Sequence, residues 1–232
     1  MAEVPALVDV PAPAPAAVAR ATSLREQVED AIAAAIVTGE LAPGELVSAP
    51  VLATRYGVSA TPVREAMLNL EARGFVTTVR NKGFRVTEVH RDDVASLIAV
   101  RRLLEPPAVG QLAAERHELV AEHAPRLRSL ADAIVAGARS GDLVAYLRAD
   151  TLFHSELLAL LGNRHLVQVV GQLRSQTRLI GLATAIGTPK LEQSAVEHYE
   201  LLDLVLAGDA AAAEAYMSHH VSAVLDWWAP PI

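Results

Sequence analysis

The N-terminal fold is decided by residues 57–72, which read Gly-Val-Ser-Ala-Thr-Pro-Val-Arg-Glu-Ala-Met-Leu-Asn-Leu-Glu-Ala. Ser59 suits an N-cap, and the apolar residues from Val63 to Leu70 recur at helical spacing, so a helix with one apolar face is predicted over 61–72. A shorter helix is predicted over 50–56, because Pro50 suits a first helical position and Gly57 stops the helix. Two helices joined by a glycine-containing turn predict a helix-turn-helix.

The segments on either side complete a winged unit. Residues 75–80 and 84–89 alternate like strands around Asn81-Lys82-Gly83, which is a hairpin signal. Upstream, a first helix is predicted from an N-cap at Ser23 to a stop at Gly39. Residues 1–21 hold four prolines among alanines and valines and almost no charge, so a disordered tail is predicted there. The winged helix-turn-helix domain is therefore placed at 22–89.

The rest of the chain, 90–232, is predicted to be an antiparallel, all-α helical bundle. Hydrophobic residues make up 52% of the chain and aromatic residues only 4%, with alanine and leucine dominant, which favours helices packed on helices. Glycine and proline divide the segment into six predicted helices, near 91–115, 118–139, 142–161, 164–186, 189–207 and 209–228. The expected fold class is mainly α, and the centre of such a bundle can hold a ligand.

The distribution of charge favours DNA binding more than the net charge of −7 does. Residues 64–91 carry six basic and three acidic side chains, a local charge of +3, whereas residues from 92 onward carry 11 basic and 17 acidic ones. The chain has no cysteine, which excludes a thiolate metal site. No apolar run reaches the roughly 20 residues that span a bilayer, and no signal peptide is recognisable, so a cytoplasmic protein without a membrane partner is expected.

The N-terminal end of the second helix of such a motif enters the major groove. The residues there are Ser59, Thr61 and Arg64, which can bind phosphate oxygens or, through the arginine, the edge of a guanine. At the wing tip Asn81 and Lys82 supply polarity and charge, and Gly83 allows a close approach of the backbone to DNA.

Arg55, with Arg80 and Arg85, is predicted as a flanking phosphate contact. Alternatively, Ser59 only caps a helix and Arg64 is a solvated surface charge. The hairpin in the right place favours the DNA-reading interpretation.

Four residues of the bundle form a candidate metal site. Asp150 and His154 lie four apart on one predicted helix and project from the same face. His198 and His220 lie on two later helices that can place them opposite each other. Three imidazoles and one carboxylate suit Zn²⁺, with Ni²⁺ and Mn²⁺ as alternatives. From spacing alone, histidines that merely pack or face solvent are the alternative.

Residues 24–88 resemble the winged-helix domain of the GntR family of bacterial regulators. The matching segments are Ile36-Val-Thr-Gly39-Glu-Leu41-Ala-Pro43-Gly44, Leu52-Ala53, Gly57-Val-Ser-Ala-Thr-Pro-Val-Arg-Glu-Ala66 and Leu70-Glu-Ala-Arg-Gly74-Phe75. The resemblance implies operator contacts from Ser59, Thr61, Arg64, Lys82 and Gly83. Ala60 stands where this family usually has arginine, and Ala49-Pro50 replaces a common polar pair, so the family's operator sequence is not carried over.

Residues 91–227 resemble the FCD effector domain of the FadR branch of that family, and six predicted helices place it near the vanillate-type regulators. The matching segments are Val100-Arg-Arg-Leu-Leu-Glu105, Asp150-Thr-Leu-Phe-His154, Gly162-Asn163, Glu197-His198, Gly208-Asp209 and Met217-Ser-His-His220. The resemblance implies that Asp150, His154, His198 and His220 hold the metal. It also implies that Arg101 or Arg102 pairs with an effector carboxylate; a surface ion pair between Arg102 and Glu105 is the alternative.

The expected function is a ligand-responsive transcriptional regulator, a repressor rather than an enzyme. It would bind a near-palindromic operator in double-stranded DNA as a homodimer, because a second half-site adds the contacts that one winged helix lacks. A small carboxylate effector at the metal site would control it. A metalloenzyme is the rival from another class, but the sequence shows no general base beyond the ligands themselves. A purely structural metal is the other alternative.

Overall fold

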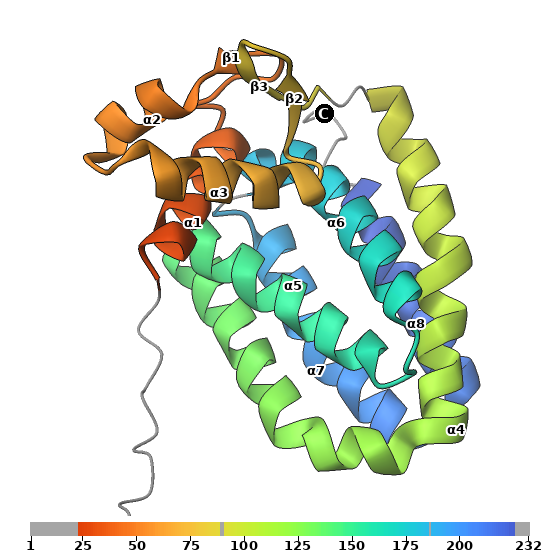
Figure 1. Ribbon diagram of the computed structural model, residues 1–232. Helices are drawn as coiled ribbons and strands as arrows, with labels where there is room; N and C mark the ends of the chain where they lie inside the picture. The colour runs from red at the N-terminus through yellow and green to blue at the C-terminus, as the bar shows by residue number, and fades with distance from the viewer. Residues whose placement is uncertain (1–22, 89–90, 186, 226–232) are drawn as a thin grey trace, which may run out of the picture.

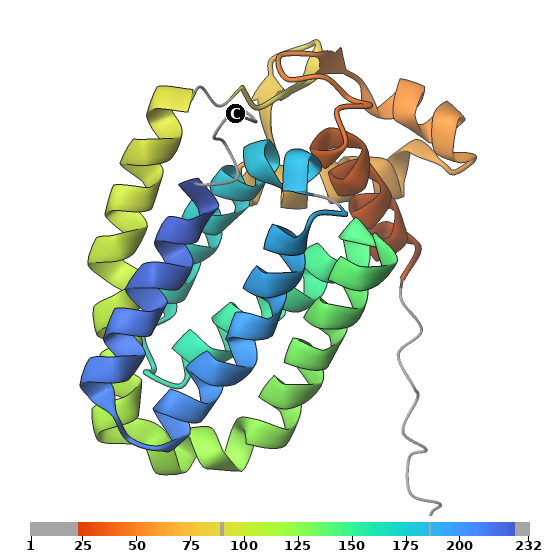
Figure 2. The same ribbon diagram turned by 180° about the vertical axis from the view of Figure 1, so that it is seen from behind.

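The computed structural model describes residues 23–88, 91–185 and 187–225 and shows two helical units joined end to end (Figures 1 and 2). Its elements are α1 (Leu24–Val37), β1 (Leu46–Val47), α2 (Ala49–Tyr56), α3 (Ala60–Ala72), β2 (Val76–Val79), β3 (Gly83–Val86), α4 (Arg91–Ser140), α5 (Leu143–Ala159), α6 (Arg164–Ala185), α7 (Pro189–Leu206) and α8 (Ala210–Ala223). The mainly α fold class is confirmed. The predicted disordered tail lies outside the described residues.

The winged unit forms as the sequence predicts. Ser23 caps α1 in a capping box whose partner is Glu26, and Gly57 ends α2 in the left-handed conformation with φ 66°. The strands pair antiparallel in the order β1-β3-β2, and Val79 faces Gly83 across the hairpin. The third strand, β1, was not predicted. It explains Gly83, because a Cβ there, at φ 122°, would clash with the carbonyl oxygen of Val47.

The bundle differs from the predicted six helices. The two helices expected at 91–115 and 118–139 are one 50-residue helix, α4, and Pro106, Pro107 and Pro125 all lie inside it. A proline removes one backbone hydrogen bond and bends a helix without having to end it. The ribbon of α4 turns at the far end of the bundle, so that its two arms flank the remaining helices (Figure 1). The prediction of a helix boundary near residue 117 was therefore wrong.

The two units touch through α1 and α3 of the winged unit and α5 and α6 of the bundle. Arg148 of α5 pairs with Asp30 of α1 at 3.5 Å, and Gln172 of α6 donates to the carbonyl of Ala72 at 3.2 Å. A cleft of about 320 Å³ lies between α1 and α5. Within the described part of the chain, none of the helices combines the length and the apolar character that a membrane span requires.

Candidate DNA-reading surface and buried metal centre

The N-terminal end of α3 presents free polar groups to solvent. Ser59 occupies the N-cap position, but its side chain makes no capping hydrogen bond. The side chains of Thr61 and Arg64 are exposed, and neither side chain forms a hydrogen bond or ion pair with another described residue. The groups that the sequence assigned to DNA are therefore not used within the fold.

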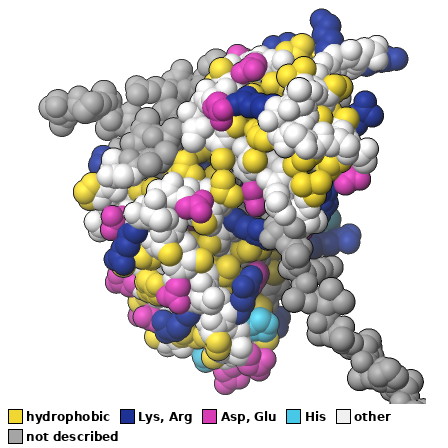
Figure 3. All heavy atoms as spheres, turned by 90° about the vertical axis from the view of Figure 1, so that its left-hand side faces the viewer, with side chains coloured by type: hydrophobic (Ala, Val, Ile, Leu, Met, Phe, Trp, Pro, Cys, Tyr) yellow, Lys and Arg dark blue, Asp and Glu magenta, His cyan; other side chains and the backbone are white. Residues whose placement is uncertain are grey.

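The other predicted DNA contacts are distributed around α3. Asn81 and Lys82 are exposed at the hairpin tip, where Asn81 adopts a positive φ of 62°. Gly83 is half-buried and packs against β1. Arg55 forms an ion pair with Glu40 at the surface. Figure 1 shows α2, α3 and the strands gathered at one end of the bundle, and on the face seen in Figure 3 basic and acidic side chains are interspersed.

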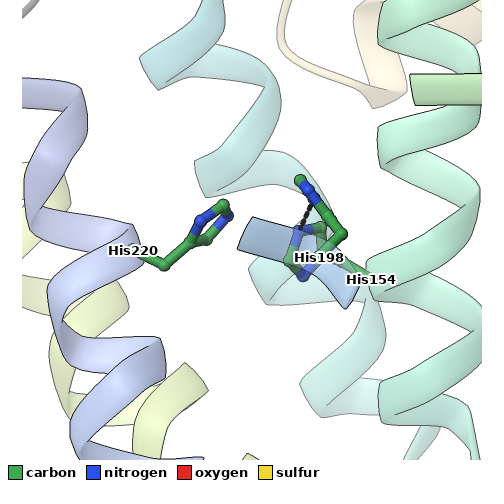
Figure 4. Close-up of side chains that lie close together, drawn as sticks. All are labelled: His154, His198 and His220. Carbon is green, nitrogen blue, oxygen red and sulfur yellow. Dashed lines mark hydrogen bonds between the residues drawn. The ribbon is translucent and has the colours of Figure 1, made fainter. Parts of the chain in front are cut away.

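The three predicted histidine ligands converge in the interior of the bundle. His154 of α5, His198 of α7 and His220 of α8 are at most 4% exposed, and each offers a ring nitrogen within 4.8 Å of the others. Figure 4 shows the rings pointing toward one another, with the Nε2 atoms of His154 and His198 3.0 Å apart. His219 is exposed, as its position one residue from His220 predicts.

Hydrogen bonds outside the cluster fix the tautomers of two rings. His198 Nδ1 lies 3.0 Å from the carbonyl oxygen of Ala195, which can only accept, so this nitrogen is the donor. His220 Nδ1 donates to Glu197 Oε2 at 2.7 Å. In the neutral form of each of these two rings the lone pair is therefore on Nε2. Outer partners of this kind orient metal-binding histidines.

Asp150 lies beside the histidines, although sequence spacing alone did not show how. Its Oδ1 is 3.3 Å from His198 Nε2 and 3.8 Å from His154 Nε2. Two ligands of one Zn²⁺ lie about 3 to 3.4 Å apart, given bonds of about 2.0–2.1 Å. The same oxygen is fully buried and has no hydrogen-bond partner among the described residues, and its close contact with Arg178 is an ion pair. This donor set therefore fits a divalent ion.

Burial and charge set the protonation of the cluster. Burial lowers the pKa of His154 well below its ordinary value and that of His220 to about 4, so both rings are neutral at pH 7. Burial opposes the charge of Asp150, but Arg178 and Arg174 hold the pKa of this carboxyl well below its usual range. Neutral imidazoles and an ionised carboxylate are the forms that bind metals.

The two predicted effector arginines have different environments. Arg101 is 2% exposed and is engaged with Glu105, at 2.5 Å from Nε to Oε1, and with Thr177 at 3.1 Å. Arg102 projects about 100° away around the helix and is exposed. The alternative pair between Arg102 and Glu105 is not formed, because Glu105 is fully buried and binds Arg101 and Arg174.

Sequence reasoning missed Arg174 and Arg178 of α6. Both are buried, and both form ion pairs with Asp150. The sequence signal for this pair is the four-residue spacing, which places both arginines on one face of a helix, and a helix of a bundle buries one of its faces. Arginines are seldom buried unless they are paired, so the spacing of these two did not by itself indicate burial.

Comparison with known proteins identifies the family to which the chain belongs. Residues 24–86 match the model described as bacterial regulatory proteins of the gntR family, and residues 96–223 match the FCD domain. A probable D-xylose utilization operon transcriptional repressor of Paenarthrobacter nicotinovorans is 32% identical over 204 residues, covering 88% of each chain. The chain belongs to the GntR family.

Two further relatives support this assignment. The Nta operon transcriptional regulator of Aminobacter aminovorans is 30% identical over 186 residues, which cover 79% of this GntR-family chain and 84% of the relative. The solved structure of E. coli McbR/YncC is similar with a TM-score of 0.65 and 25% identity, covering 86% of this chain and 94% of that one. The GntR-family chain is thus a DNA-binding transcriptional regulator and not an enzyme, as the sequence predicted.

Proposed function

We propose that this regulator is a homodimeric repressor whose operator affinity is controlled by a small carboxylate bound at a metal in the bundle. The observation that carries the proposal is the convergence of His154, His198, His220 and Asp150 Oδ1 on one buried point. These four residues would hold the ion, Zn²⁺ in the first place and Ni²⁺ or Mn²⁺ otherwise. A bound ion would supply a Lewis-acid position for a carboxylate oxygen.

We propose that α5 couples the effector site to the winged unit, which is the DNA head of the protein. This helix carries Asp150 and His154 toward the centre and Arg148 toward Asp30 of α1. A ligand shifts only an equilibrium between states that it binds differently. A shift of α5 on effector binding would change the Arg148–Asp30 contact and the position of the DNA head. We propose that this change releases the operator.

The operator contacts that we propose are Ser59, Thr61 and Arg64 from α3, Asn81, Lys82 and Gly83 from the wing, and Arg55 as a flanking phosphate contact. The first five of these are exposed, as a DNA surface requires, whereas Gly83 is half-buried and would contribute its backbone. Two such heads would read a near-palindrome.

The dimer surface that we propose lies on the first arm of α4, beside α8. There Leu103 is 76% exposed and Val100 42% exposed. Exposed large apolar side chains next to one another favour association. We also propose that the chain belongs to the FadR branch of the family, in its vanillate-type form. The domain limits that we propose are 22–89 and 90–232.

The test begins with selection of bound duplexes from a random pool by the full chain. The expected product is a near-palindrome with half-sites about one helical turn apart. Fluorescence anisotropy with that duplex then measures operator affinity against added Zn²⁺ and organic acids. A lowered affinity with both present supports the proposal. An affinity that neither metal nor any organic acid changes contradicts the sensing function.

A further inference from the structure

Unpartnered polar atoms in the interior are concentrated at one place. Among the described residues, six buried side-chain atoms have no hydrogen-bond partner, and five of them belong to Tyr146, Asp150, Arg174 and Arg178. Buried polar groups are nearly always hydrogen-bonded, because desolvation without a partner is costly. Four of these five atoms are donors: the Tyr146 hydroxyl, Arg174 Nε, and Nε and Nη1 of Arg178. Such a cluster of donors matches an anion.

Arg178 forms fewer hydrogen bonds and ion pairs with the described residues than the other two buried arginines do. Arg101 uses Nε, Nη1 and Nη2 on Glu105 and Thr177, and Arg174 uses Nη1 on Glu105 and Nη2 on Asp150. Arg178 forms an ion pair with Asp150 through Nη2, and its Nε and Nη1 have no hydrogen-bond partner among the described residues. Its guanidinium carbon lies 5.4 Å from the centre of the Tyr146 ring. Burial raises the pKa of Tyr146, so its hydroxyl stays protonated and can donate.

The charge balance of the centre indicates the charge of the ligand. Three buried arginines, Arg101, Arg174 and Arg178, are balanced by the buried carboxylates of Glu105, Asp150 and Glu197, and histidines that bind a metal ion are neutral. A divalent ion at the histidines would leave two uncompensated positive charges in the interior. Buried charge without compensation is strongly unfavourable. A dianion restores neutrality, whereas a monocarboxylate does not.

The distance between the metal position and the Arg178 guanidinium limits the size of the ligand. Asp150 Oδ1 lies 3.3 Å from His198 Nε2 and also contacts Arg178 Nη2. The metal position and the guanidinium are therefore separated by a single carboxylate group. A dicarboxylate that reaches both has to be short.

We propose that Arg178 and Tyr146 form a second anchor of the effector site and select a short dicarboxylate. One carboxylate would lie at the metal position, and the other would accept hydrogen bonds from Arg178 Nη1 and the Tyr146 hydroxyl. This inference rests on the proposed function, because it places the first carboxylate at the metal.

The test is isothermal titration of the full chain loaded with Zn²⁺, with malonate and succinate as probes and acetate and adipate as comparisons. Malonate or succinate binds at least tenfold more tightly than acetate and adipate. Tyr146→Phe weakens that binding about tenfold, the loss expected for one hydrogen bond to a charged group. Removal of an unpartnered hydroxyl leaves the stability of the ligand-free protein unchanged or raises it. Tyr199→Phe, whose hydroxyl bonds to Asp132 at the surface, is the matched control and binds as the wild type does.

The inference is overturned by acetate binding as tightly as succinate, by wild-type affinity in Tyr146→Phe, or by no binding of either short dicarboxylate. Its failure is distinguishable from failure of the proposed function. If succinate binds through Tyr146 but leaves operator affinity unchanged, the anchor is supported and the sensing function is contradicted. If carboxylates change operator affinity equally in Tyr146→Phe and wild type, the anchor is contradicted and the sensing function is supported. A wild-type chain that binds none of Zn²⁺, Ni²⁺ and Mn²⁺ contradicts both.

Discussion

Asp150→Asn is the substitution that most directly tests the electrostatics of the buried centre. In the wild type the Asp150 carboxylate contacts both Arg174 and Arg178 and is itself fully buried. Arg174 keeps Glu105 as a partner after the substitution, but Arg178 has no other acidic partner among the described residues. Loss of one member of a buried ion pair costs about 3–5 kcal/mol, because the other charge stays buried and unpaired.

The assay is urea unfolding followed by circular dichroism in the presence of a chelator, so that metal binding does not contribute to stability. The matched control is Asp203→Asn, which removes an aspartate from an ion pair with Arg128 whose side chains are 58% and 46% exposed. Exposed pairs contribute about 0–1 kcal/mol. A free energy of unfolding that falls by no more in Asp150→Asn than in Asp203→Asn would refute the reasoning.

Four other predictions follow from the same geometry. Arg64→Ala weakens operator binding in anisotropy titrations by about 1–3 kcal/mol, whereas Arg164→Ala on the exposed bundle surface has no effect. Gly83→Ala destabilises the wing by about 1–3 kcal/mol in thermal unfolding, since it adds a Cβ at φ 122° against β1; an unchanged midpoint would disprove the clash. His220→Ala lowers Zn²⁺ affinity at least about tenfold in competition titrations, while the exposed His219→Ala binds as the wild type does. In the presence of a chelator, the free energy of unfolding falls by roughly 3 kcal/mol as the pH falls from about 6.5 to 4, because His220 is protonated in the unfolded chain while its pKa in the folded protein is about 4. A free energy of unfolding that stays constant from pH 6.5 to 5 would contradict this prediction.

The winged unit could be predicted from the sequence because its signals are local. Ser23, Gly57 and the hairpin turn each fix the backbone within a few residues, and the structure places α1, α2, α3 and the hairpin as predicted. Strand β1 could not be predicted, because two residues show no alternation and their pairing with β3 is a tertiary contact. The prolines of α4 misled the prediction for the same reason: packing against α5, α7 and α8 holds the helix together across them.

The candidate site was predictable only in part. The histidines were found from the family resemblance and from helical spacing, and the structure brings all three together. The role of Arg174 and Arg178 depends on Asp150, which lies more than twenty residues away on another helix. Burial of an arginine depends on a partner that only the folded structure brings close.

The buried metal site can be located by anomalous X-ray diffraction from crystals of the zinc-loaded full chain. We predict one strong anomalous peak about 2.0–2.2 Å from Nε2 of His154, His198 and His220 and from Oδ1 of Asp150. Absence of a peak there, or a peak held by other residues while these four keep their present contacts, would contradict it.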